Sequence, residues 1–215
     1  MLCRVKTVGY GGGARSAIDD CRLLMLNLQS VSQQRWLTQV DESLDDIRVD
    51  HAHCEYKAAA NAMSIMGAYI ENEEICREMT AIIEEELEHF YLVLALLKRR
   101  DIEFRNQQAG HYGRELNGLV RARGAERAVD RMLVASLIEA RSCERFSLLA
   151  EHVQDEELSV FYRSLFESEA RHHTTYVRMA KHFAADVVVK KRLEELSALE
   201  SEIIGKGNPL PRMHS

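Results

Sequence analysis

Proline is absent from this chain before position 209 and occurs only at positions 209 and 211. The chain is also rich in Ala, Leu, Glu and Arg, which lose little side-chain freedom in a helix. Because proline is the residue that most strongly breaks a helix, long helices can form throughout this stretch. A chain of 215 residues can bury one core as a single domain. The sequence therefore predicts an all-α fold.

Hydrophobic periodicity divides the chain into helical stretches. Four long helices are expected at about 46–71, 73–100, 125–151 and 155–184, with a short one at about 33–46 and an amphipathic one at about 187–204. Asn72 lies at the first turn between long helices, and Asp155 can cap the fourth long helix. Residues 101–124 form a polar connection with four glycines, long enough to run the length of a bundle and to carry a short helix.

Short connections join helices 1–2 and 3–4 of the four long helices, so each pair is expected to form an antiparallel hairpin. Two hairpins joined by one crossover have the connection of ferritin-like folds. We therefore predict a ferritin-like four-helix bundle with a long crossover between helices 2 and 3 and extra flanking helices. The expected division is an N-terminal extension of unknown role at 1–30, the ferritin-like domain at 31–204 and a C-terminal tail at 205–215.

One polar pattern occurs once in each predicted hairpin. A glutamate on the first helix is followed, one helix later, by a Glu-x-x-His motif. The six residues are Glu55, Glu86 and His89 in the first half, and Glu139, Glu169 and His172 in the second. Residues i and i+3 project from the same face of a helix, so each motif can bind one ion through both of its side chains. Two such halves, packed about a pseudo-two-fold axis, bring four carboxylates and two imidazoles to one centre.

Apolar neighbours place these carboxylates inside the predicted bundle; Ile82, Ile83 and Phe90, for example, flank Glu86 in the sequence. Buried carboxylates are costly unless they are neutralised. Two Fe(II) ions would balance four carboxylates, and mixed carboxylate and imidazole ligands suit iron or manganese better than a metal that prefers thiolates. The repeat therefore predicts a centre that holds two iron ions.

Other polar residues are weaker candidates for this centre. Glu144 lies five residues after Glu139 and is the chief alternative for the third-helix ligand. His51 and His53 have no counterpart in the second half, which favours a structural role or a place beside the ligands. The acids next to Glu86 fit a solvated helix face: Glu84, Glu85 and Glu88.

Composition excludes several classes of protein. No apolar run approaches the ~20 residues that span a bilayer, so no membrane association is expected. The five cysteines are scattered without CxxC spacing, which argues against a disulfide framework or a thiolate zinc site and favours a cytoplasmic location. The formal net charge is −6, so a nucleic-acid partner would have to be bound by a local basic patch.

Four segments carry a more specific resemblance: DHAHCEYKAA at 50–59, EEELEHF at 84–90, IEARSCERF at 138–146 and FYRSLFESEARH at 161–172. They resemble the MiaE family of di-iron tRNA hydroxylases, which act on 2-methylthio-N6-isopentenyladenosine beside the anticodon. The resemblance covers about residues 45–185, and PRMHS at 211–215 is similar to the family's C-terminus. Carried over by motif, it implies that all six residues of the repeat are metal ligands and that Glu86 and Glu169 bridge the irons.

The resemblance implies an O2-dependent di-iron monooxygenase that hydroxylates the isopentenyl group of this nucleoside in tRNA. Hydroxylation consumes four electrons, two from the C–H bond and two from outside. The sequence has no flavin or nicotinamide fingerprint and no rubredoxin-type cysteine cluster, so a separate electron-transfer protein or reductase is expected. Two alternatives would use the same ligands: a ferritin-like iron-oxidising or storage protein, and a di-iron oxygenase of a small-molecule substrate. The oligomeric state stays open.

A tRNA partner requires positive charge on the surface of this acidic protein. Arginines at the two ends of the crossover are the candidates for phosphate contacts, and ordinary helix-surface charge is the alternative because Glu and Asp are interspersed. An extruded base would suit a buried site. The expected RNA-binding residues are Arg99, Arg100, Arg121, Arg123 and Arg127.

Overall fold

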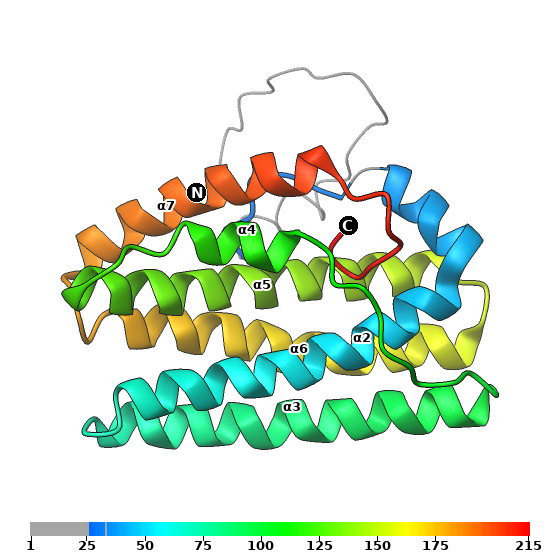
Figure 1. Ribbon diagram of the computed structural model, residues 1–215, viewed down its shortest axis with the longest axis horizontal. Helices are drawn as coiled ribbons and strands as arrows, with labels where there is room; N and C mark the ends of the chain where they lie inside the picture. The colour runs from blue at the N-terminus through cyan, green and yellow to red at the C-terminus, as the bar shows by residue number, and fades with distance from the viewer. Residues whose placement is uncertain (1–25, 33) are drawn as a thin grey trace, which may run out of the picture.

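The computed structural model describes residues 26–32 and 34–215, and the regular structure of these residues is entirely helical. Four long helices form two antiparallel hairpins, which lie side by side along the long axis of the molecule (Figure 1). The hairpins are α2 (Gln34–Ala68) with α3 (Glu73–Arg99), and α5 (Gly124–His152) with α6 (Glu156–Ala180). The predicted all-α bundle is confirmed. Most of the extension expected at 1–30 lies outside the described residues, and the expected domain boundaries stay predictions.

Two shorter helices flank the bundle, as the sequence predicted. The crossover from α3 to α5 carries α4 (Tyr112–Gly118), and α7 (Asp186–Lys206) follows α6. Both helices contact α5, and they also contact each other. Figure 1 shows them on the side of α5 that faces away from α3. They therefore cover one face of the bundle and leave the α3 side uncovered.

The helix expected at about 33–46 is not separate. It continues into the first long helix as α2, with a kink at Ser43, whose backbone (φ −147°, ψ 41°) is not helical. Trp36 and Val40 before the kink and Ile47 after it belong to one buried apolar cluster with Phe146 of α5. Both arms of α2 therefore cover the same apolar surface, and the kink does not interrupt the packed segment.

Side-chain caps begin the second helix of each hairpin. The Asn72 side chain accepts a hydrogen bond from the backbone N–H of Ile75, and Asp155 accepts one from Leu158, both at 3.0 Å. Each cap satisfies a backbone donor that the first turn of a helix leaves free. The predicted cap at Asp155 is confirmed, and α6 ends at Ala180, somewhat before the expected end near 184.

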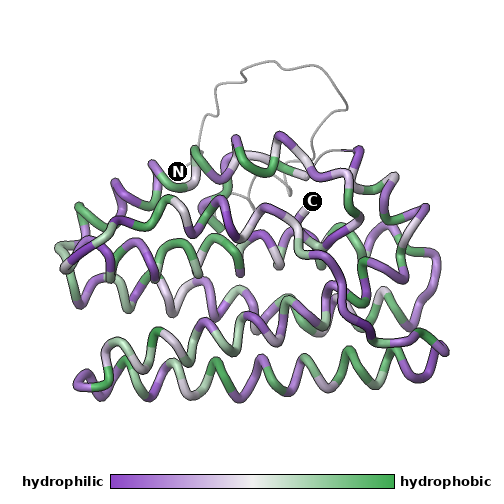
Figure 2. Tube along the Cα trace, in the orientation of Figure 1, coloured by the Kyte–Doolittle hydropathy of each residue, from purple (hydrophilic) through white to green (hydrophobic). Residues whose placement is uncertain are grey.

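The core runs between the facing sides of the helices. Figure 2 shows hydrophobic and hydrophilic residues alternating along each trace, as expected for helices with one buried face. The buried apolar side chains include Ile65, Met79, Leu133 and Met179, all fully shielded from solvent. Within the described part of the chain, no helix is both long and apolar enough to cross a membrane. Because the core is apolar, charged residues buried in it require specific partners.

A buried ion pair fastens the flanking helices to the bundle. Arg141 of α5 donates from Nε and Nη2 to the two carboxylate oxygens of Glu200 on α7, each at 2.8 Å. The Tyr112 hydroxyl of α4 donates to the same carboxylate at 3.0 Å. Arg141 and Glu200 are both fully buried. One carboxylate thus holds α4, α5 and α7 at fixed positions.

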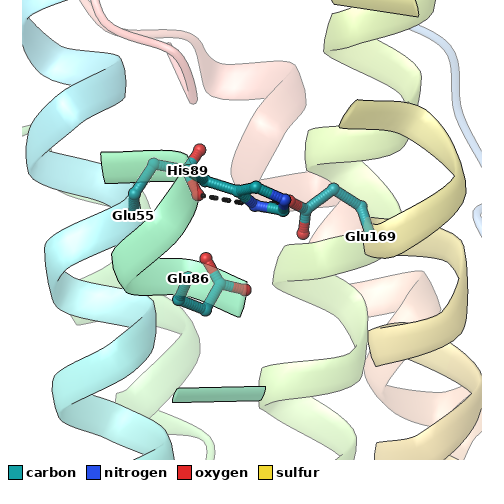
Figure 3. A group of neighbouring side chains, drawn as sticks. All are labelled: Glu55, Glu86, His89 and Glu169. Carbon is teal, nitrogen blue, oxygen red and sulfur yellow. Dashed lines mark ion pairs between the residues drawn. The ribbon is translucent and has the colours of Figure 1, made fainter. Parts of the chain in front are cut away.

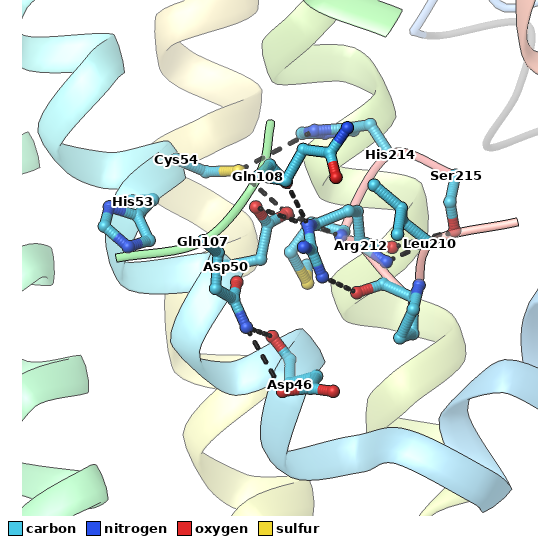
Figure 4. Close-up of polar contacts among 12 residues, drawn as sticks. Asp46, Asp50, His53, Cys54, Gln107, Gln108, Leu210, Arg212, His214 and Ser215 are labelled. Carbon is cyan, nitrogen blue, oxygen red and sulfur yellow. Dashed lines mark hydrogen bonds and ion pairs between the residues drawn. The ribbon is translucent and has the colours of Figure 1, made fainter. Parts of the chain in front are cut away.

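The segment after α7 returns to the bundle. Gly207 has a φ of 68°, a left-handed conformation that favours glycine, and the chain turns there toward α2. Asp50 of α2 accepts a hydrogen bond from the backbone N–H of Met213 at 2.9 Å, and Trp36 donates its indole N–H to the Arg212 carbonyl at 2.9 Å. Figure 4 shows this segment bound against α2. Residues 212–215 are buried, so they are part of the packed structure.

Replacing Glu200 by Ala should destabilise the fold by about 3–5 kcal/mol, because the buried Arg141 would lose both of its hydrogen bonds to the Glu200 carboxylate and keep only Glu144 as an acidic partner. Urea unfolding followed by circular dichroism measures this free energy. Glu202→Ala is the matched control: Glu202 is an exposed glutamate of the same helix, and its loss should change stability by less than about 0.5 kcal/mol. Equal stability of the two variants would contradict the role assigned to the ion pair.

Candidate metal centre

The structure brings together all six residues of the repeat, and each of the four long helices contributes. All six side chains are buried. They are Glu55 from α2, Glu86 and His89 from α3, Glu139 from α5, and Glu169 and His172 from α6. The i, i+3 spacing of the two motifs sets each glutamate beside its histidine on an inward helix face.

Two overlapping groups of ligand atoms form within this set. The first contains Glu55 and His89, the second contains Glu139 and His172, and both contain Glu86 and Glu169. One nitrogen or oxygen atom from each member lies within 4.8 Å of the others in its group. Figure 3 shows the first group. Glu86 and Glu169, which the family resemblance implies would hold both ions, are thus the two carboxylates common to both groups.

Contact distances show how compact the centre is. His89 Nδ1 lies 3.2 Å from a Glu169 oxygen and 3.6 Å from a Glu55 oxygen. His172 Nδ1 lies 2.8 Å from a Glu86 oxygen and 3.5 Å from a Glu169 oxygen. In both histidines the Nδ1 atom is therefore the one that faces the carboxylates.

The donor atoms of this centre fit metal ions. Both oxygens of Glu86, both oxygens of Glu169 and the Nδ1 atoms of His89 and His172 are buried, and their close contacts with one another lack hydrogen-bond geometry, so none has a hydrogen-bond partner among the described residues. Buried polar atoms without partners are costly, and cations coordinated by their lone pairs would remove that cost. Carboxylate oxygens with imidazole nitrogens suit iron or manganese. The ferritin-like arrangement and this Glu/His cluster are thus compatible with a di-iron centre.

Without metal, the centre must hold protons. Burial and the neighbouring carboxylates raise the pKa values of Glu86 and Glu139 well above the ordinary range. Burial acts in the same direction on Glu55 and Glu169, but contacts with histidine rings outweigh it and lower their pKa values. Burial would lower the pKa of His89, yet Glu169 and Glu55 raise it to about 10. The metal-free centre is therefore a network of shared protons.

The outer nitrogen of each histidine has its own partner, on the helix that bears the other histidine. His172 Nε2 lies 3.0 Å from a Glu85 oxygen, and His89 Nε2 lies 3.2 Å from the Ser168 hydroxyl. Glu85 and Ser168 each directly precede the glutamate of a Glu-x-x-His motif. Such partners fix the orientation of a ligand histidine. The sequence favoured a solvated face for Glu85, although its matched position with Ser168 was a signal for this role.

Several weaker candidates from the sequence lie beside or outside the centre. His51 is buried with Nε2 2.6 Å from Glu55 Oε1, so it contacts the cluster through Glu55. His53 instead contacts the Arg105 carbonyl at 2.9 Å. Glu144 accepts hydrogen bonds from the backbone and hydroxyl of Ser32 at 2.6 and 2.5 Å. It also lies 3.3 Å from Arg141 Nη1 and belongs to neither group of ligand atoms, so the geometry favours Glu139 as the third-helix ligand.

The centre lies at the buried end of a pocket of about 370 Å³, within the ~300–1,000 Å³ typical of small-ligand sites. The lining includes all four glutamates of the cluster and an apolar stretch of α5: Val134, Ala135 and Ile138. Residues of α2, of α4 and of the crossover complete the wall. A wider hollow beside the α2–α3 turn contains none of the six residues.

His214 supplies part of the pocket wall, a role that no sequence pattern indicated. Its ring stacks on Tyr112 with centroids 5.0 Å apart, and its Nε2 lies 3.3 Å from the Ser142 hydroxyl. Burial and the charges of Arg145 and Arg141 lower the pKa of His214 to about 3, so the ring is neutral. Figure 4 shows it beside Cys54, the residue before Glu55.

The model of the family described as tRNA-(MS[2]IO[6]A)-hydroxylase (MiaE) matches residues 23–215. The chain belongs to the MiaE family. A MiaE-family relative from Pseudomonas putida, named tRNA 2-(methylsulfanyl)-N(6)-isopentenyladenosine(37) hydroxylase, is 37% identical over 180 residues, which cover 84% of this chain and 87% of the relative. A protein of the same name from Salmonella typhimurium is 26% identical over an alignment 237 positions long, which spans 87% of this chain and 87% of that protein.

A solved structure supports the ferritin-like fold. "Protein 43 with aldehyde deformylating oxygenase activity from Synechococcus" aligns with a TM-score of 0.84 and 36% identity, covering 87% of this chain and 95% of that protein. The predicted ferritin-like bundle and the predicted MiaE membership are both confirmed. The assignment of the six residues as ligands stays a proposal that the geometry supports.

The arginines predicted to meet RNA differ in their surroundings. Arg99 and Arg100 pair with acids at the start of α6, and Arg121 pairs with the fully buried Asp130. The other two are exposed: Arg123 and Arg127. None of the five lines the pocket. Their role in RNA binding stays a prediction.

Replacing Glu139 by Ala should lower the iron content from about two ions per chain to one or fewer, because the second group would lose a carboxylate. Glu144→Ala should keep both ions, since Glu144 bonds to Ser32 instead. Metal analysis after anaerobic loading with Fe(II) and removal of unbound iron measures both variants. The reverse pattern would show that Glu144 is the ligand.

Metal binding should release protons. His89, with a pKa of about 10, holds a proton near pH 7, and the raised pKa values of Glu86 and Glu139 keep these carboxyls protonated to higher pH than ordinary glutamates; all three must lose protons to coordinate a cation. The affinity for divalent metal should therefore rise with pH across the neutral range. Anaerobic titration with Mn(II) in weak buffer containing a pH indicator measures the release. Metal uptake without acidification would contradict the protonation pattern.

Proposed function

We propose that this chain is an O2-dependent di-iron monooxygenase that hydroxylates the isopentenyl group of 2-methylthio-N6-isopentenyladenosine in tRNA. The observation that carries the proposal is the placement of the six-residue cluster at the buried end of an open pocket, in a chain of the MiaE family. A surface site would meet bulk water, and a closed centre could not admit a substrate. This arrangement suits a reaction between O2 and a group inserted from outside.

Each part of the pocket has a distinct task in this proposal. The six residues would hold two iron ions, and such a centre supplies O2 activation next to the substrate. Val134, Ala135 and Ile138 offer an apolar wall for the isopentenyl chain and keep water away from the reacting carbon. The stacked pair of Tyr112 and His214 lies in the same wall and offers aromatic and polar contacts to the adenine ring.

Residues outside the ligand set hold the cluster in position. Glu85 and Ser168 fix the two histidine rings through their outer nitrogens, so that both Nδ1 atoms face inward. His51 holds one oxygen of Glu55. The Tyr176 hydroxyl is buried without a hydrogen-bond partner among the described residues, and its pKa is raised by burial and by the cluster glutamates. It therefore remains a neutral phenol near the centre.

The electron balance requires a partner. One oxygen atom of O2 enters the C–H bond and the other leaves as water, which takes two electrons and two protons from outside. The chain carries no flavin or nicotinamide fingerprint of its own, so an electron-transfer protein or reductase would supply the electrons. The cytoplasmic location expected from the sequence stays a prediction, and it agrees with a tRNA substrate.

The proposal is tested with iron-loaded protein, O2, an electron source and tRNA that carries the prenylated nucleoside. Mass analysis of the nucleosides should show a gain of one oxygen atom with the unaltered protein and none with Glu139→Ala, which lacks a proposed ligand. Glu84→Ala is the matched control, because Glu84 is an exposed glutamate two residues from Glu86. This control should hydroxylate like the unaltered protein.

Two outcomes would favour other functions. Aerobic addition of excess Fe(II) that deposits many irons per chain, with no nucleoside change, would indicate a storage protein. Consumption of O2 with an aldehyde but not with tRNA would indicate a small-molecule oxygenase, the kind of activity for which the solved relative from Synechococcus is named. Uptake that stops near two irons, together with nucleoside oxidation, supports the proposal.

A further inference from the structure

The pocket that reaches the metal centre is charged differently at its two ends. Its buried end contains the cluster glutamates, all at most 4% exposed. Its outer part contains Lys57 of α2, Arg114 of α4 and Arg131 of α5, of which the first two are exposed and the third is half-buried. We call these three residues the pocket mouth. They come from three helices that converge around one opening.

The mouth cations have no acidic partners among the described residues. Arg131 donates to the Ser64 hydroxyl at 3.0 Å, and no carboxylate pairs with Lys57 or Arg114 in the described part of the chain. The lining includes no exposed carboxylate. Arg100 and Arg121 at the ends of the crossover, by contrast, are held by acids. The mouth is thus a cluster of cations free to bind anions, on a protein of net charge −6.

The size of the pocket determines what each end can contact. A volume of about 370 Å³ admits one substituted base and excludes a second nucleotide or a duplex. An extruded base that reaches the cluster leaves its sugar and the flanking phosphates at the opening. Phosphates contribute most of the affinity of proteins for nucleic acids. Unpaired cations around an opening of this size match that requirement.

We infer that Lys57, Arg114 and Arg131 bind the backbone phosphates on either side of the modified nucleotide, so that the base enters between α2, α4 and α5. The inference rests on the proposed function, which supplies the RNA substrate. It locates the phosphate contacts at the pocket mouth and not at the crossover arginines predicted from the sequence. It also fixes the direction of entry, because the mouth opens on the side of the bundle that bears α4.

The test compares tRNA affinity among charge-matched double variants of the iron-loaded protein at several salt concentrations. Lys57→Ala with Arg114→Ala should weaken binding on the order of tenfold at 0.1 M salt and flatten the log-log salt dependence by about 0.7 for each lost contact. Lys98→Ala with Arg163→Ala is the control: both residues are exposed and lie outside the pocket. It should bind tRNA like the unaltered protein. Iron content and thermal unfolding show whether each variant is folded.

The outcomes separate this inference from the proposed function. If the mouth variant binds tRNA with unchanged affinity and salt dependence, the mouth is not the phosphate site, whether or not the tRNA is hydroxylated. If Arg123→Ala with Arg127→Ala loses binding instead, the phosphates lie at the end of the crossover. If the unaltered protein binds tRNA through the mouth but leaves the nucleoside unoxidised, the proposed reaction fails and the binding surface stands.

Discussion

Four carboxylates face one another inside this bundle, and the rest of the structure has to hold them there. Their mutual repulsion in a medium without water would drive the helices apart unless protons or cations neutralise them. Each carboxylate comes from a different helix, so the spacing of the four helices sets the geometry of the centre. The Arg141–Glu200 pair and the caps at Asn72 and Asp155 stabilise that spacing from outside the cluster.

The two halves are alike at the cluster and different around it. His172 contacts the Glu85 carboxylate through its outer nitrogen, whereas His89 contacts the Ser168 hydroxyl. A carboxylate partner makes an imidazole a stronger electron donor than a hydroxyl does, so the two metal positions would differ in electronic character. The pocket does not distinguish the two halves, because its lining includes both glutamates of each half and neither histidine.

The sequence predicted the fold and the composition of the centre because both depend on local regularities. Helix periodicity and the i, i+3 spacing of Glu86 and His89 are visible within a short segment of the sequence. The repetition of the same pattern in the second half predicted the other residues of the cluster. Other features depend on long-range placement. Lys57 and Arg114 share an opening only after α4 has packed on the bundle, and nothing in either local sequence indicates this. The spacing of the repeat favoured Glu139 over Glu144, and the contacts of Glu144 with Ser32 and Arg141 agree with that preference.

The segment after α7 forms part of the pocket wall, and its place at the end of the sequence affects the order in which the site assembles during synthesis. The six residues of the centre lie between positions 55 and 172, whereas His214 and the rest of the segment after α7 come later in the chain. A ribosome releases the chain from its N-terminus onward, and segments can fold as they emerge. The two hairpins can therefore begin to assemble before the segment that binds Asp50 and Trp36 has left the ribosome. Formation of the six-residue cluster is thus separable in time from completion of the pocket wall.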